Sequence, residues 1–172
     1  MVISLTGFKG SGKSTVAKEM GCLLDTPVFD LDELVFAKYG DIEKLISDCG
    51  EGHFRRIEMQ TLQELFFLHR EDFILSLGGG TILNEESLDM IRNDSVCVYL
   101  EVPYEIMLER IGDYRKYAIF SGCRNRGGVR RLYEKRLPIY EAAAHCVVRY
   151  RDRSIKETAS EVIRTVTCFR NQ

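Results

Sequence analysis

A glycine-rich segment near the N-terminus carries the clearest chemical pattern in the chain. Residues 7–14 read Gly-Phe-Lys-Gly-Ser-Gly-Lys-Ser and match G-x-x-x-x-G-K-[ST] at every fixed position. In such a loop the backbone N–H groups surround phosphate oxygens, Lys13 reaches the β- and γ-phosphates, and Ser14 binds Mg²⁺. An apolar stretch precedes the segment and a helical stretch follows it, which is the context of a phosphate loop rather than of a plain turn. The sequence therefore predicts a nucleoside triphosphate site.

Two acids after the second apolar stretch form a further pattern. The segment reads Phe29-Asp30-Leu31-Asp32, whereas the third stretch, 73–77, ends in glycines and offers no acid. Strand alternation predicts that Asp30 and Asp32 point to the same side, at the sheet edge where open α/β folds bind ligands. One carboxylate would hold Mg²⁺ through water, and the other would accept a proton or hydrogen bond from a substrate hydroxyl. The alternative is that Asp32 caps the helix that follows it.

Alternating strands and helices must position these residues. The alternation predicts crossover units and a parallel sheet covered on both faces, which is a three-layer α/β/α sandwich formed by one domain over 1–172. Residues 112–128 contain four glycines and many charges, so we expect a mobile loop there. Apolar stretches predict strands at 2–6, 27–30, 73–77, 96–102 and 146–150, and helical periodicity predicts helices at 14–24, 32–39, 41–48, 54–69, 85–92, 104–111, 129–144 and 155–169.

Composition excludes several classes of protein. The chain has 172 residues, a net charge of -2 and no basic excess typical of nucleic-acid binding. No apolar run is long enough to span a membrane, and the first one is too short for a signal peptide. The six cysteines form no CxxC pair, so we expect free thiols in a reducing compartment rather than disulfides or a zinc site. A cytoplasmic monomer is the expectation.

Several segments together resemble shikimate kinase, a family within the nucleoside-monophosphate-kinase-like group of P-loop kinases. The resemblance covers nearly the whole chain and implies the strand order 2-3-1-4-5, a mobile lid at about 112–127 and substrate-binding helices at about 31–60. The phosphate loop alone is shared by many families, but the combination in this order is much more specific. The matching segments are 7–15, Asp30 with Asp32, Gly50-Glu51, Phe54-Arg55 with Glu58, Gly78-Gly79-Gly80, and Arg136 with Pro138-Ile139-Tyr140.

The resemblance implies a role for most of these residues. Ser14 and, through water, Asp30 would hold Mg²⁺, while Lys13 and Asp32 would be catalytic. Glu58 would hold Arg55 in place, and arginine forks match the carboxylate of a small polyol acid. The resemblance assigns nucleotide binding to Gly10, Ser11, Gly12, Lys13, Ser14, Thr15 and Arg110, and substrate binding to Asp32, Arg55, Gly78, Gly79, Gly80 and Arg136.

Each of the substrate-binding residues also has a purely structural interpretation. Arg55 lies close in sequence to Glu51 and Glu58 and could form a surface ion pair at i,i+3 spacing. Arg136 could cap carbonyl groups near a helix end, and 78–80 could be a plain turn. Their joint occurrence around one sheet edge favours the binding interpretation.

The lid departs from the family pattern. Family members carry an Arg-Pro pair there, and its arginine reaches the transferring phosphates. Counted back from Arg136 without gaps, Tyr117 and Ala118 occupy these two positions. Loss of a phosphate-facing arginine can cost about 10³–10⁵ in rate. We expect Arg115 to supply the missing catalytic charge. The alternatives are Lys116, Arg124 and Arg126.

These features predict an ATP-dependent kinase. By resemblance, it would phosphorylate the 3-hydroxyl of shikimate on the path to chorismate and the aromatic amino acids, with Mg²⁺ as cofactor and with ATP, ADP and shikimate as binding partners. The first alternative is a kinase of the same fold for a gluconate-like polyol acid or a nucleotide. The second is a degenerate P-loop module that binds nucleotide without phosphoryl transfer, which only the altered lid favours.

Overall fold

A five-stranded parallel sheet forms the centre of the computed structural model, which describes residues 1–171. The strand order is β2-β3-β1-β4-β5, which confirms the predicted order. All four neighbouring pairs are parallel, and Leu5 of the central strand pairs with Ser76 on one side and Val98 on the other. Gln172, the last residue of the predicted domain, lies outside the described residues. The strands are β1 (Val2–Thr6), β2 (Val28–Asp30), β3 (Phe73–Ser76), β4 (Val96–Glu101) and β5 (Cys146–Arg149).

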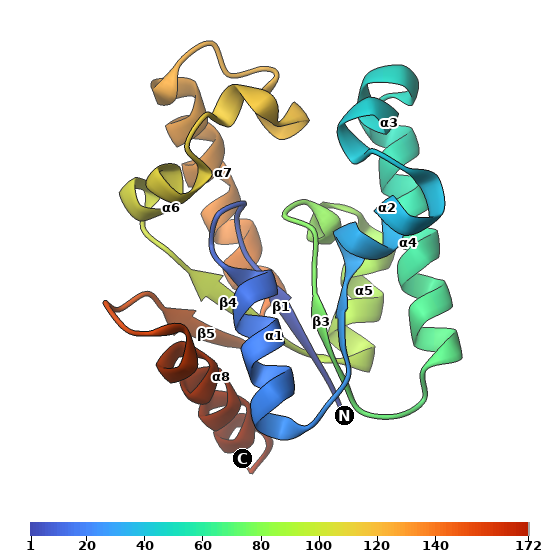
Figure 1. The fold of residues 1–172 in the computed structure, drawn as a ribbon, viewed down its shortest axis with the longest axis vertical. Coiled ribbons are helices and arrows are strands. Elements are labelled where there is room, and N and C mark those ends of the chain that lie inside the picture. Colours follow the sequence, from blue (N-terminus) through green and yellow to red (C-terminus); the bar gives the residue numbers. More distant parts are fainter. Residues whose placement is uncertain (172) are drawn as a thin grey trace.

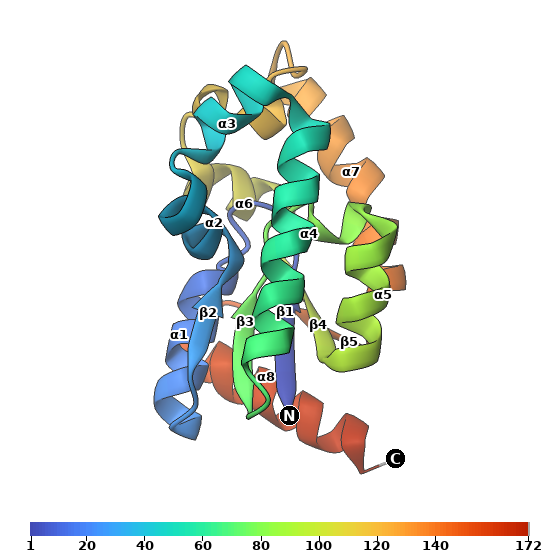
Figure 2. The ribbon, with the colours of Figure 1, turned by 90° about the vertical axis from the view of Figure 1, so that its right-hand side faces the viewer.

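Helices cover both faces of the sheet, as Figures 1 and 2 show. Helices α1 (Lys13–Leu24) and α8 (Ile155–Arg170) pack on one face, and α4 (Glu51–Leu68), α5 (Glu85–Asp94) and α7 (Arg126–Ala143) pack on the other. No helix within 1–171 is long and apolar enough to cross a lipid bilayer. The remaining helices lie beyond the carboxyl ends of the strands. They are α2 (Leu31–Tyr39), α3 (Ile42–Cys49) and α6 (Tyr104–Ile111). Short 3₁₀ turns are formed by Thr81–Leu83, Tyr114–Lys116 and Ala118–Phe120.

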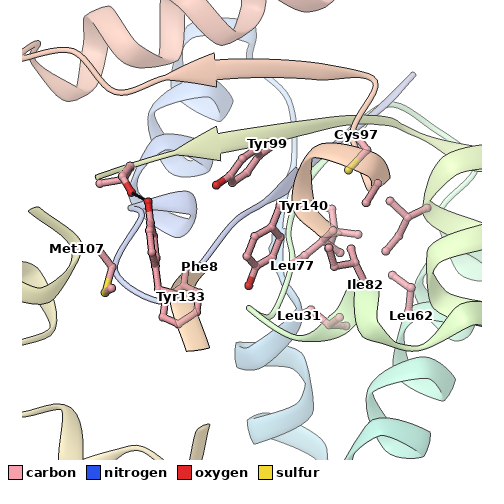
Figure 3. Close-up of a cluster of buried hydrophobic side chains, with 14 of the residues drawn as sticks. Phe8, Leu31, Leu62, Leu77, Ile82, Cys97, Tyr99, Met107, Tyr133 and Tyr140 are labelled. Carbon is pink, nitrogen blue, oxygen red and sulfur yellow. Dashed lines mark hydrogen bonds between the residues drawn. The ribbon is translucent and has the colours of Figure 1, made fainter. Parts of the chain in front are cut away.

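An aromatic cluster joins the phosphate loop to the core. Tyr99 of β4 stacks on Tyr140 of α7, with ring centroids 5.3 Å apart. Phe8, from the loop after β1, contacts Tyr133 edge-on at 5.5 Å and Tyr140 at 6.5 Å (Figure 3). Phe8 is almost fully buried, and an aromatic ring removed from water in this way is a strong anchor. The loop therefore has a defined position relative to the sheet.

Two helices begin three residues earlier than the sequence patterns predicted. Helix α4 starts at Glu51 instead of 54, because Gly50 adopts a φ of 82° and ends the preceding segment immediately before it. Helix α7 starts at Arg126 instead of 129, because the side chain of Asn125 accepts the N–H of Gly128 and caps the helix. The first turn of each helix contains glycine, which is unfavourable in helices, so the sequence pattern did not indicate the true first residue.

The lid contains more structure than a plain loop. Residues expected to lack regular structure form two 3₁₀ turns between α6 and α7. Phe120 anchors them: it is only 2% exposed, and its ring lies 6.0 Å from those of Phe8 and Tyr114. A single buried aromatic carries no periodicity, so the sequence pattern could not reveal this anchor. Motion of the lid stays a prediction.

A glycine inside α1 gives a test of how closely that helix packs on β2. A methyl group at Gly21 would lie 2.3 Å from Cγ2 of Val28 and 3.0 Å from the carbonyl oxygen of Thr26. We therefore expect Gly21→Ala to lower the free energy of unfolding by about 1–3 kcal/mol, although alanine favours helices. Gly52→Ala in α4 is the matched control, because nothing lies within 4 Å of the added methyl group. The control should stabilise by up to about 1 kcal/mol. Urea unfolding measures both, and a stabilised Gly21→Ala variant would contradict the packing.

Candidate active site

The phosphate loop has the backbone shape that its sequence predicts. Gly10 and Gly12 adopt φ values of 84° and 90°, a region that side chains other than glycine rarely enter. Lys13 begins α1 and folds its ammonium group back over the loop, where Nζ donates to the carbonyl oxygens of Gly7 at 2.9 Å and Phe8 at 3.2 Å. The loop thus presents an N-terminal helix end and a buried cation to the same space.

The pKa of Lys13 is lower than that of an ordinary lysine. Burial lowers its pKa to about 8, while the carboxylates of Asp32 and Asp30 act in the opposite direction. The ammonium group of Lys9, one of the variable positions in the loop, lowers the pKa further. A bound phosphate would favour the charged form, so Lys13 is placed to couple protonation to anion binding.

Oxygen ligands suited to a divalent cation meet beside the loop. The hydroxyl of Ser14 donates to Oδ2 of Asp30 at 2.5 Å and lies 3.2 Å from the hydroxyl of Ser76. Mg²⁺ in nucleotide sites uses one or two protein oxygens together with phosphates and water, so these residues fit it. The described part of the chain holds no group of three or more His, Cys, Asp or Glu residues that could bind a metal.

The structure corrects one expectation about the acids and excludes one alternative. Helix α2 already begins at Leu31, so Asp32 lies in the first helical turn and strand alternation does not apply to it. The cap of α2 is Asp30, not Asp32: Oδ1 of Asp30 accepts the N–H groups of Asp32 at 3.0 Å and Glu33 at 3.3 Å. The carboxylate of Asp30 therefore serves the helix with one oxygen and Ser14 with the other, while that of Asp32 faces the cleft.

Asp32 sits in a mixed electrostatic environment. Burial raises its pKa, and the negative charge of Asp30 raises it further. The positive charges of Lys13, Lys9 and Arg55 act in the opposite direction. A carboxylate with a raised pKa is a better proton acceptor than an ordinary aspartate, which is the property that a general base requires.

Arg55 and Glu58 form a buried pair, not the surface pair of the structural alternative. The guanidinium group of Arg55 donates to Glu58 at 2.7 Å and to Glu51 at 3.0 Å. Glu58 is 1% exposed and its second oxygen accepts the hydroxyl of Thr81 at 2.5 Å. Burial raises the pKa of Glu58, and the charge of Arg55 opposes that rise. Glu58 thus fixes the direction in which Arg55 reaches the cleft.

Two glycines of the triplet, Gly78 and Gly80, lie in close contact with these side chains. A methyl group at Gly78 would lie 2.4 Å from Oε1 of Glu58 and 2.9 Å from Oδ1 of Asp32. At Gly80 it would lie 2.2 Å from the guanidinium group of Arg55. The triplet therefore lets charged side chains approach the backbone beyond β3, a reason that the sequence alone did not supply.

Arg136 lies behind the triplet. It is 7% exposed, and Nη1 donates to the carbonyl oxygen of Gly79 at 3.1 Å, which the hydroxyl of Tyr140 also contacts. It binds this loop instead of capping its own helix. Its side chain is not among those that line the cleft, so the structure brings Arg136 to the edge of the site, next to the segment that Arg55 contacts from the other side.

One cleft of about 340 Å³ unites the phosphate loop with the acidic and glycine-rich segments. A second cavity of about 410 Å³ adjoins it beside Arg110, whose guanidinium group lies 5.4 Å from the ring centroid of Tyr150 and 3.4 Å from the carbonyl oxygen of Ser11. Thr15 lines both spaces. The first cleft has room for a small polar substrate, and the second has apolar walls suited to a nucleoside base.

The structure does not bring Arg115 into this cleft. Its side chain is 77% exposed and its Nε donates to Asp113 at 2.9 Å, so the catalytic role expected of it stays untested. The lid instead contributes Tyr117 and Ile119. Sequence reasoning also missed Lys9, which lines the cleft, whereas the neighbouring variable position Phe8 is buried in the core.

The fold and the site together define a P-loop phosphotransferase with a separate pocket for a small acceptor. A family model for shikimate kinase matches residues 9–167. The chain belongs to the shikimate kinase family. The shikimate kinase of Dictyoglomus turgidum is 34% identical over 168 residues and covers 94% of each chain. That of Aquifex aeolicus is 34% identical over 144 residues, 83% of each chain.

Solved structures agree with this assignment. A shikimate kinase from Acinetobacter baumannii in complex with shikimate superposes with a TM-score of 0.90 at 26% identity, covering 99% of this chain and 95% of that one. The shikimate kinase of Aquifex aeolicus superposes with a TM-score of 0.81 at 30% identity, covering 98% and 97%. The similarity thus extends over the whole length of both chains.

The lowered pKa of Lys13 predicts that nucleotide affinity falls in alkali. Phosphate binds the ammonium form, so raising the pH through about 8 should weaken MgATP binding about 10- to 30-fold between about pH 7.5 and about pH 9.5. Titration calorimetry at several pH values measures this. Lys13→Arg is the control, because a guanidinium group stays charged throughout and should give a flat profile. A flat profile in the unchanged protein would contradict the assignment.

Proposed function

We propose that this chain transfers the γ-phosphoryl group of ATP to the 3-hydroxyl of shikimate, as an active member of its family. The observation that carries the proposal is the shared cleft, which residues of the phosphate loop line together with the carboxylate of Asp32 and the guanidinium group of Arg55. Shikimate offers the complementary groups: hydroxyls for Asp32 and a carboxylate for Arg55. The alternative substrates, a gluconate-like acid or a nucleotide, have no specific observation in their favour.

Transfer needs an acceptor hydroxyl held in line with the γ-phosphate. In the proposed reaction the hydroxyl oxygen forms a bond to phosphorus, the bond from phosphorus to the β–γ bridging oxygen breaks, and the hydroxyl proton passes to Asp32. The raised pKa of Asp32 suits this proton transfer. Lys13 and the loop N–H groups would hold the phosphates, and positioning supplies much of the rate.

The substrate would be oriented by residues on both sides of the glycine triplet. We assign its carboxylate to Arg55, with Arg136 contributing from behind Gly79. Gly78, Gly79 and Gly80 would present backbone groups to the ring. The paired positions of the two arginines around one short segment support this assignment.

The nucleotide would lie across the loop with its base in the second cavity. We assign the phosphates to residues 10–15 and the adenine to the space beside Arg110 and Tyr150. Mg²⁺ would be held by Ser14 directly and by Asp30 through water, and it would neutralise charge on the phosphates. The cleft is built from one chain, and all six cysteines are free, so a monomer in the cytoplasm remains our expectation.

The direct test is ADP release from MgATP by the purified protein with and without shikimate. We expect release to depend on shikimate at ordinary kinase rates, about 1–100 per second. ATP binding without stimulation by shikimate would contradict the proposed substrate. A parallel series with gluconate and nucleoside monophosphates would then identify the acceptor.

Asp32→Asn tests the proposed general base. We expect kcat to fall by about 10²–10⁴ while the affinity for MgATP is retained, because the amide keeps the shape but cannot take the proton. Asp89→Asn on α5 is the matched control, since Asp89 is exposed and does not line the cleft, and its activity should be unchanged. Full activity in Asp32→Asn would remove this residue from the mechanism.

A further inference from the structure

The positive side chains of the cleft differ in how they are engaged. Lys13 donates to the carbonyl oxygens of the loop, and Arg55 is paired with two carboxylates. Arg110 contacts the loop from the nucleotide side. Lys9 alone among them has no hydrogen-bond acceptor or carboxylate partner within residues 1–171, and its ammonium group lies 4.0 Å from the ring centroid of Tyr117. A cation over an aromatic face keeps its N–H donors available to a ligand.

Lys9 and Tyr117 each lie next to residues that are packed into the protein. Lys9 lies between buried Phe8 and Gly10, and an added methyl group at Gly10 would lie 2.9 Å from the carbonyl oxygen of Met107. Tyr117 packs against the buried ring of Phe120, with centroids 6.4 Å apart. Figure 1 shows the lid, between α6 and α7, on the same side of the sheet as the phosphate loop. The pair therefore bridges two anchored segments at the mouth of the cleft.

The lid is also tied to the opposite wall. The N–H of Ala118 donates to the carboxylate of Glu43, which joins the lid to α3 across the cleft. Figure 2 shows α3 beside the lid segment at this end of the molecule. Tyr117, next to Ala118, lies over Lys9, so the tertiary structure brings the aromatic ring and the ammonium group together.

Phosphoryl transfer requires positive charge at the transferring group. Negative charge spreads over its equatorial oxygens in the transition state, and preorganised cations stabilise it. Lys9 lines the same cleft as Lys13 and Asp32, so it faces the space between the phosphate loop and the acceptor pocket. Arg115 is turned away toward Asp113. Lys116, Arg124 and Arg126, the other lid cations considered, do not line the cleft, so the geometry leaves Lys9 as the cation available for this purpose.

We propose that Lys9 is a second phosphate-binding lysine, which contacts the γ-phosphate of the bound nucleotide, and that Tyr117 positions it. The two residues would together supply the charge for which the altered lid has no arginine. This inference rests on the proposed function for its acceptor, shikimate, but its nucleotide contact can be measured separately.

Kinetics of Lys9→Met test the contact in catalysis. We expect kcat to fall about 10- to 100-fold, the effect of removing one charged hydrogen bond, with the KM for shikimate changed less than about threefold. Lys9→Arg should retain most activity, because it keeps the charge. Lys135→Met, an exposed lysine of α7 outside the cleft, is the matched control and should behave as the unchanged protein. An unchanged kcat in Lys9→Met would overturn the proposal.

Substitutions at Tyr117 test the pairing. Tyr117→Phe keeps the ring and Tyr117→Ala removes it, so kcat should be higher in the phenylalanine variant than in the alanine variant. Tyr117→Arg added to Lys9→Met should recover at least about tenfold in kcat, because a guanidinium group on this side chain reaches the space that the ammonium group left. Absence of recovery would contradict the inference that these two positions serve the same phosphate.

Nucleotide binding without shikimate separates this inference from the proposed function. Calorimetry with MgATP and MgADP should show that Lys9→Met weakens ATP binding at least about tenfold and ADP binding less than about twofold. If the unchanged protein shows no shikimate-dependent turnover but Lys9→Met loses its preference for ATP, the substrate assignment fails and the role of Lys9 stands. Equal losses for both nucleotides would overturn the role of Lys9.

Discussion

The backbone path of the phosphate loop is the constraint on which the rest of the site depends. Gly10 and Gly12 hold left-handed conformations that set the path of the loop, and Phe8 fixes that loop to the aromatic core. Lys13 folds over it, and Arg110 packs on its outer side. Because Phe8 anchors the loop in the core, the cations that contact the loop, Lys13 and Arg110, have defined positions.

The acceptor half of the cleft depends instead on a buried charge. Glu58 is costly to bury unless it is paired, and Arg55 and Thr81 supply the partners that make it tolerable. The same pairing turns Arg55 toward the space beyond β3. Side chains larger than hydrogen at Gly78 and Gly80 would occupy the positions of these groups. The burial of the Glu58 carboxylate and the presence of glycine at positions 78 and 80 therefore depend on the same packing.

The lid shows how a local change alters a contact across the cleft. Where family members have proline, Ala118 has an N–H, and Glu43 of α3 accepts it. Where they have the arginine of that pair, Tyr117 offers an aromatic face to Lys9. Through Ala118 and Tyr117 the lid thus contacts both α3 and the phosphate loop. In our proposal the charge for the transferring group comes from the loop side of the cleft, which Lys9 lines.

The sequence by itself determined the phosphate loop, the succession of elements and, through the family resemblance, the order of the sheet. Steric limits at glycine and the burial pattern of short apolar strands are local properties that a sequence displays directly. Tertiary structure alone decided that Asp30 accepts the hydroxyl of Ser14, that Arg136 stands behind Gly79, and that Lys9 rather than Arg115 faces the cleft. These outcomes depend on which side chains from distant segments compete for the same partner, and that competition is settled only when the elements pack.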